Sequence, residues 1–170
     1  MCGIIGFTGN LQAPGILVDG LQQLEYRGYD SAGIAVNNGS ETKIVKTTGK
    51  VATLREKVEA TADLAGTCGI GHTRWATHGG VTEVNAHPHV SGNVTLIHNG
   101  IIENYKELAA SLKTKGFTAI SETDTEVAAM LIDSLYDGDP FAALKEADQM
   151  LEGAYGFCVM FKDHPARSTA

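Results

Sequence analysis

Residues 1–8 read MCGIIGFT, and this stretch decides how the fold begins. Its apolar residues and interspersed glycines predict a buried strand over 2–8, at the very start of the chain. Removal of Met1, which is common when a small residue follows, would give Cys2 a free α-amine. An unperturbed α-amine has a pKa of about 7.7–8.0, so one residue can carry both a nucleophile and a base. The stretch is interpreted in two ways: as a purely structural buried strand, or as the mount of a nucleophile. The two interpretations are compatible, because a strand buried at its N-terminus holds a nucleophile rigidly.

Outward from this strand, apolar spacing and turn residues predict both helices and strands. Leu17, Leu21 and Leu24 fall on one helical face after Pro14, and residues 37–40 read NNGS between two short strand-like runs, as in a hairpin. Strands gather early and helices late, without strict alternation, which favours an α+β fold over a doubly wound parallel sheet. Predicted helices cover 14–27, 51–58, 104–115, 123–135 and 139–151, and predicted strands cover 2–8, 34–36, 43–46, 68–72, 94–98 and 155–161.

Three of the predicted helices begin with capping signals. Asn104 and Thr123 are each followed three residues later by a glutamate, which is the spacing of a capping box. Asp139 precedes a proline that suits the first helical turn. These residues are expected to mark the helix starts.

Bulk composition narrows the class of protein. There are 13 basic and 20 acidic residues, a net charge of −7, and the basic residues are scattered, so no surface for nucleic acid or an anionic membrane is expected. No run approaches the ~20 apolar residues of a membrane span, and residues 1–18 lack the basic start and unbroken apolar core of a signal peptide. Three cysteines without CxxC spacing predict reduced thiols. The 170 residues are expected to form one cytoplasmic domain.

Three polar positions could bind or stabilise a substrate. Residues 71–79 read GHTRWATHG, in which Arg74 offers a planar fork for a carboxylate and Trp75 an apolar lid; a surface cation–π pair is the alternative. Asn99 and the glycine after it give the strongest hairpin signal in the sequence, but their amide and backbone N–H could instead form an oxyanion hole. Asp124 falls in a first helical turn, where it either stabilises the helix or holds a substrate ammonium.

Six histidines raise the question of a metal site. His72, His78, His87 and His89, taken with Cys68, match no compact zinc signature, so no metal is expected, and a structural zinc module is the weaker alternative. No GxGxxG or GxxxxGK[ST] motif occurs, so no nucleotide or other cofactor is expected.

Six segments occur in an order that is more specific than any one of them. They are CGIIG at 2–6, YRGYDSAG at 26–33, HTRWATHG at 72–79, EVNAHPH at 83–89, HNGIIEN at 98–104 and SETDTE at 121–126. The set resembles the glutaminase domains of class II, or N-terminal-nucleophile, glutamine amidotransferases. Within that class it resembles the glutamine–fructose-6-phosphate aminotransferases, also called glucosamine-6-phosphate synthases. The resemblance extends to about His164.

This resemblance implies a four-layer αββα sandwich of the N-terminal-nucleophile hydrolase type, and an enzyme that hydrolyses L-glutamine through a Cys2 γ-glutamyl thioester. Asn99 and Gly100 would form the oxyanion hole, and no cofactor is implied. Arg74 would bind the α-carboxylate of the substrate and Asp124 its α-ammonium. Thr77 and His78 would line the same pocket. Trp75 would lie where ammonia leaves, and Arg27 would support the nucleophile.

The resemblance also implies partners beyond these residues. In the family the glutaminase domain continues past residue 170, and two sugar-isomerase modules that bind fructose 6-phosphate follow it. We therefore expect 1–170 to be a glutaminase domain shortened at its C-terminal end, which supplies ammonia to those modules for glucosamine 6-phosphate synthesis. A homodimer of the full-length form is left open. Retention of Met1 would instead predict a catalytically silent glutamine-binding or docking fragment.

Overall fold

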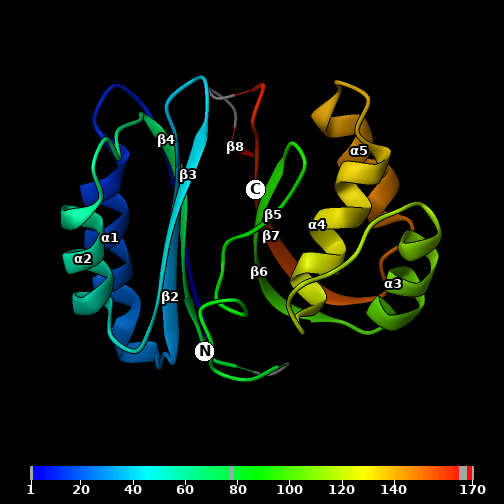
Figure 1. Ribbon diagram of the computed structural model, residues 1–170, viewed down its shortest axis with the longest axis horizontal. Coiled ribbons are helices and arrows are strands. Elements are labelled where there is room, and N and C mark those ends of the chain that lie inside the picture. The colour runs from blue at the N-terminus through cyan, green and yellow to red at the C-terminus, as the bar shows by residue number, and fades with distance from the viewer. Residues whose placement is uncertain (1, 77–78, 165–167, 170) are drawn as a thin grey trace.

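The computed structural model describes residues 2–76, 79–164 and 168–169. In this part of the chain two four-stranded antiparallel sheets pack face to face, and helices cover the outer face of each sheet (Figure 1). The layers follow the order helix, sheet, sheet, helix. The predicted α+β class and four-layer αββα sandwich are confirmed.

The first sheet carries the N-terminal strand in antiparallel pairing. Gly3 lies opposite Thr73 and Thr8 opposite Cys68, so the start of the first strand meets the end of the fourth. The strand order is β1-β4-β2-β3, with β1 Gly3–Thr8, β2 Ser31–Asn37, β3 Thr42–Thr48 and β4 Cys68–Arg74; the outer layer holds α1 Ala13–Leu24 and α2 Val51–Ala60, and the 3-10 helix η1 Glu25–Arg27 follows α1.

The second sheet is built from the middle and the end of the chain. Its longest pairing joins β6 Val94–Ile102 with β7 Gly153–Phe161, so that Val94 lies opposite Phe161. The strand order is β5-β6-β7-β8, with β5 His89–Ser91 and β8 Ser168–Thr169; the outer helices are α3 Tyr105–Thr114, α4 Asp124–Leu135 and α5 Pro140–Asp148. No helix in these described ranges is long and apolar enough to cross a bilayer.

Apolar side chains fill the space between each pair of neighbouring layers. One cluster joins the first sheet to α1 and α2, and a larger one joins the second sheet to α3, α4 and α5. A third cluster lies between the sheets, where Ile70 of β4 meets Ile97 of β6 and Met160 of β7. Burying one such side chain contributes about 1.5–3 kcal/mol, so this cluster holds the two sheets in a fixed relation.

The capping predictions have mixed outcomes. Thr123 and Asp139 cap α4 and α5, because their side chains accept hydrogen bonds from Glu126 N–H and from Phe141 N–H. The capping box predicted at Asn104 is wrong. Its side chain instead donates to the Met150 carbonyl oxygen and accepts from Glu152 N–H, which ties the start of α3 to the entry into β7.

Of the two alternatives for Asn99 and Gly100, the hairpin is excluded. Both residues lie inside β6, opposite Gly156 and Tyr155 of β7. Gly100 has a φ of +126°, and a Cβ atom there would overlap the Ala154 carbonyl oxygen of the paired strand. A close approach between two strands, not a chain reversal, therefore requires this glycine.

Candidate active site at the junction of the two sheets

Cys2 lies directly before β1, beside the end of β4. Trp75 N–H donates a hydrogen bond to Cys2 Sγ at 3.1 Å, and the thiol lies 3.7 Å from the Trp75 carbonyl oxygen. The next residue, Gly3, donates its N–H to Thr73 Oγ1 at 3.0 Å. Antiparallel pairing of β1 with β4 therefore holds a half-buried thiol next to the predicted Arg74-Trp75 pair.

The other two thiols are in a different environment. Cys68 and Cys158 are buried in the core between the sheets. Burial raises the pKa of the Cys68 thiol, and it raises the pKa of the Cys158 thiol to about 11. Both remain protonated near neutral pH and are poor nucleophiles, because the thiolate is the reactive form.

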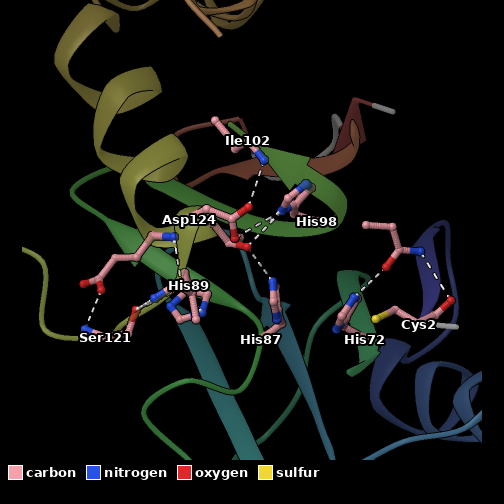
Figure 2. Close-up of polar contacts among 12 residues, drawn as sticks. Cys2, His72, His87, His89, His98, Ile102, Ser121 and Asp124 are labelled. Atoms are coloured by element: carbon pink, nitrogen blue, oxygen red, sulfur yellow. Dashed lines mark hydrogen bonds and ion pairs between the residues drawn. The ribbon is translucent and has the colours of Figure 1, made fainter. Parts of the chain in front are cut away.

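Asn99 reaches Cys2 from the opposite sheet. Its Nδ2 donates to the Cys2 carbonyl oxygen at 3.4 Å, although the two residues are 97 positions apart in the sequence. Its Oδ1 lies 2.8 Å from His72 Nε2 of β4, and His72 lies beside Cys2 in Figure 2. Gly100 follows on the exposed part of β6. The fold thus brings the predicted nucleophile next to the predicted oxyanion donors.

Asp124 and Arg74 bring opposite charges to one cavity. Asp124 is the first residue of α4, is 5% exposed, and accepts a hydrogen bond from Ile102 N–H at 3.0 Å (Figure 2). Arg74 ends β4, is 4% exposed, and donates from Nη1 to the Gly80 carbonyl oxygen at 3.2 Å. Both line the same small cavity, together with Trp75 and Gly100. A buried carboxylate and a buried guanidinium match the two charges of an amino-acid zwitterion.

The remaining predicted site residues are either exposed or outside the described part of the chain. Trp75 is 55% exposed, and its ring lies against Gly28, where a Cβ atom would overlap it. Arg27 is exposed on η1, so its support of the nucleophile stays a prediction. Thr77 and His78 lie outside the described residues, and their lining of the pocket also stays a prediction.

Four buried histidines surround the site: His72, His87, His89 and His98. From the sequence, the first three were weighed as metal ligands and given no other role. Thr125 Oγ1 lies 2.8 Å from His87 Nε2 and 3.0 Å from His98 Nδ1, while His89 Nε2 lies 3.1 Å from Thr123 Oγ1. Desolvation by burial lowers the pKa of His89 to about 3 and holds that of His87 well below its usual value. Within 2–76, 79–164 and 168–169, no group of three His, Cys, Asp or Glu side chains could hold a metal ion. The threonine hydroxyls of Thr123 and Thr125 are the hydrogen-bond partners of His87, His89 and His98.

Asn85 and Glu122 form a contact that was not foreseen. Asn85 Nδ2 donates to the Gly80 carbonyl oxygen at 3.0 Å and to Glu122 Oε2 at 2.8 Å, and Asn85 Oδ1 accepts from Glu122 N–H at 3.0 Å. These bonds join the chain after Arg74 to the segment before Asp124, so they fix the two charged ends of the cavity together. The sequence signals for them were the EVNAHPH segment at 83–89, which contains Asn85, and the SETDTE segment at 121–126, which contains Glu122.

A larger cavity of about 550 Å³ lies elsewhere, between α5 and β7. Its lining is mainly apolar, with Phe141, Leu144 and Phe157, and none of the predicted site residues lines it. The chemistry therefore concentrates at the smaller cavity beside Cys2.

The four-layer sandwich and the thiol at the start of its first strand define an N-terminal-nucleophile amidotransferase. The fold agrees with that of the glutamine phosphoribosylpyrophosphate amidotransferase from B. subtilis, with a TM-score of 0.80 and 30% identity over 95% of this chain and 35% of that chain. The chain belongs to the glutamine amidotransferase domain family, whose model matches residues 72–169.

Curated relatives narrow the comparison further. The chain is 53% identical over 166 residues to the glutamine–fructose-6-phosphate aminotransferase [isomerizing] of Thermus thermophilus, covering 96% of this chain and 27% of that protein. It is 52% identical over 171 residues to the enzyme of the same name from Idiomarina loihiensis, covering 98% of this chain and 28% of that protein. The chain thus spans little more than a quarter of the length of these relatives.

Proposed function

We propose that this domain hydrolyses L-glutamine to glutamate and ammonia, with Cys2 as the nucleophile. The observation that carries the proposal is a small cavity lined by two buried opposite charges, Arg74 and Asp124, whose lining residue Trp75 contacts the half-buried Cys2 thiol, while the Asn99 amide reaches Cys2 from the opposite sheet. Each group comes from a different part of the chain, so their convergence is a property of the fold. The family and the relatives support the same chemistry.

The reaction begins once Met1 has been removed. The α-amine of Cys2 takes the thiol proton, and sulfur adds to the side-chain carbonyl carbon of glutamine. The carbonyl oxygen becomes an oxyanion, which Asn99 Nδ2 and Gly100 N–H stabilise. The C–N bond then breaks, the nitrogen takes the proton from the amine and leaves as ammonia, and water hydrolyses the γ-glutamyl thioester to glutamate.

Recognition of glutamine uses the two ends of the cavity. The Arg74 guanidinium pairs with the α-carboxylate and Asp124 with the α-ammonium, so the reacting amide is directed toward Cys2. Thr77 and His78 complete the lining, Trp75 covers the exit of ammonia and Arg27 supports the nucleophile. These roles follow from the resemblance, and Arg74, Trp75 and Asp124 line one cavity.

The full-length protein extends this function. We propose that residues 1–170 are a glutaminase domain shortened at its C-terminal end, and that in a cytoplasmic parent protein it supplies ammonia to sugar-isomerase domains that convert fructose 6-phosphate to glucosamine 6-phosphate. The names of the relatives support this assignment. A homodimer of the full-length form stays a prediction.

The test starts with protein shown by intact mass to begin at Cys2. Incubation with glutamine and fructose 6-phosphate should give glutamate and ammonia in equal amounts, without amino sugar from residues 1–170 alone. The Cys2→Ala variant, which keeps the fold but lacks the thiol, should give neither product. Glutamate production that survives in Cys2→Ala would refute the proposed nucleophile. Binding of glutamine without turnover in Cys2-initiated protein would favour a silent glutamine-binding module instead.

A further inference from the structure

One side-chain amide joins the two sheets at the active site. His72 lies on β4 of the first sheet and Asn99 on β6 of the second, and His72 Nε2 is 2.8 Å from Asn99 Oδ1. At its other end, the amide Nδ2 donates to the Cys2 carbonyl oxygen at 3.4 Å. The Asn99 amide therefore spans the distance from the buried His72 imidazole to the backbone of Cys2.

The two partners determine which way the amide faces. The Cys2 carbonyl oxygen can only accept a hydrogen bond, so the amide NH2 must face it and the amide oxygen must face His72. An amide oxygen also only accepts, so His72 Nε2 must carry the ring proton. A proton on Nδ1 would instead be buried without an acceptor, because Nδ1 has no hydrogen-bond partner among the described residues.

Burial and packing hold the His72 ring in this state. The residue is 1% exposed, and its pKa is lowered to about 4, chiefly by desolvation, so the ring is neutral near pH 7. The ring also packs on His87, with 4.2 Å between the centroids. A neutral ring of fixed orientation presents one donor, at Nε2, to one acceptor.

We propose that His72 is a positioning residue, which sets the rotamer of the Asn99 amide so that Nδ2, and not Oδ1, faces the reacting carbonyl. This inference rests on the glutaminase function proposed above. Without the Nε2–H donor the amide keeps only the 3.4 Å bond to the Cys2 carbonyl oxygen, so the form rotated by half a turn becomes more populated. The rotated form directs an oxygen at the developing oxyanion, which it repels. His72 acts through Asn99 alone and does not itself touch the reacting atoms.

The first experiment compares two replacements of His72 in Cys2-initiated protein. His72→Phe keeps a ring against His87 but removes the donor, so kcat for glutamine should fall by about 10–100-fold while KM stays within about threefold. His72→Gln places an amide donor at the same position and should recover kcat to within about fivefold of the parent protein. A His72→Phe variant with unchanged kcat would overturn the inference.

Inhibitor affinity gives a readout that a purely structural role would not change. The γ-aldehyde of glutamate accepts Cys2 sulfur at its carbonyl carbon: the C–S bond forms, the π bond breaks and the thiol proton passes to oxygen, with no leaving group. The adduct oxygen occupies the place of the oxyanion. His72→Phe should weaken this inhibitor by about the same factor as kcat/KM and leave the affinity for glutamate unchanged. Equal weakening of both compounds would indicate general damage and overturn the positioning role.

A double-mutant cycle then shows whether His72 acts through Asn99. Adding His72→Phe to Asn99→Ala should slow turnover by no more than about twofold, because the amide that His72 orients is already gone. If the fold-reductions in kcat of the two single variants multiply in the double variant, the inference is overturned. Turnover by the parent protein tests the glutaminase function separately. If that turnover is absent, long-range ¹H–¹⁵N spectra still locate the His72 ring proton, and a proton on Nδ1 would overturn the inference on its own.

Discussion

At the scale of single residues, exposure and partners separate Cys2 from the other thiols. Cys2 is half-buried at a strand start, whereas burial raises the pKa of both Cys68 and Cys158. A γ-diazoketone analogue of glutamine should therefore label Cys2 and leave the other two cysteines unmodified. Peptide mapping after brief exposure measures this directly. Preferential labelling of Cys68 or Cys158 would contradict the assignment of the nucleophile.

Asn99→Ala tests the oxyanion donor. Removing Nδ2 should lower kcat by about 10²–10³-fold and change KM little, because the lost hydrogen bond forms mainly in the transition state. The matched control is Asn38→Ala, in the turn where Asn38 Oδ1 accepts from Ser40 N–H and Glu41 N–H. The control should lower the melting temperature without changing kcat. If Asn99→Ala behaves like the control, Asn99 is a structural residue.

Arg74→Lys and Asp124→Asn test the recognition of the zwitterion. Each removes a charge-assisted hydrogen bond of about 1.5–3 kcal/mol, so kcat/KM for glutamine should fall by about 10–100-fold. Arg55→Lys and Asp19→Asn give the same chemical changes at an exposed ion pair of 2.7 Å between α2 and α1, and they should leave kcat/KM unchanged. Steady-state kinetics on the four variants decide whether the two charges of the cavity bind substrate.

At the scale of elements, the α5 cap offers a clean measurement. Asp139 Oδ1 accepts from Phe141 N–H at 3.0 Å and from Ala142 N–H at 3.3 Å, so Asp139→Ala should reduce the free energy of unfolding by about 1 kcal/mol. Glu146→Ala removes an equal charge from the exposed face of the same helix and should change that free energy by less than about 0.5 kcal/mol. Urea denaturation of both variants provides the comparison. Equal losses would mean that the cap does not stabilise α5.

Local signals predicted elements well and predicted their pairing poorly. The spacing of Leu17 and Leu21 was enough to place α1, because one apolar face must be buried. Asn99 and Gly100 give a strong local hairpin signal, yet they lie inside β6, because their partners on β7 are more than 50 residues later in the chain. The capping box predicted at Asn104 was wrong for the same reason, because the Asn104 side chain forms hydrogen bonds with residues just before β7, far along the chain.

The same limit explains which parts of the site were predictable. Cys2 and Asp124 could be chosen as candidates because a chain terminus and a helix start are visible in the sequence itself. The contact of His72 with Asn99 could not, because it depends on how the two sheets face each other. The spacing of residues along the sequence does not show which side chains of one sheet lie close to those of the other.

At the scale of the whole molecule, the buried histidines make stability depend on pH. Burial lowers the pKa of His72 to about 4 and of His89 to about 3, whereas an unfolded histidine has a pKa of about 6.5. As the pH falls below about 6.5, the unfolded chain therefore takes up protons that the folded chain does not. The free energy of unfolding should be greatest above that pH and should fall, on acidification toward pH 4, by up to about 1.4 kcal/mol per pH unit for each such histidine.

Urea denaturation at several pH values between 7.5 and 5.5 measures the slope of the free energy of unfolding against pH. His89→Gln should reduce the slope by about one proton, because one titrating group is gone. Leu54→Ala, at a fully buried apolar position between the first sheet and its helices, should cost about 2–5 kcal/mol equally at every pH. An unchanged slope in His89→Gln would show that His89 takes up no proton on unfolding in this range.

The 97 positions between Cys2 and Asn99 also have a consequence during synthesis on the ribosome. At roughly 5–20 residues per second, translation produces the proposed nucleophile about 5–20 seconds before the proposed oxyanion donor. One of the two strands that pair with β6 is synthesised later still, since β7 begins at Gly153. A nascent chain thus carries its thiol without the means to hydrolyse glutamine, and ammonia release begins only when the second sheet has docked on the first.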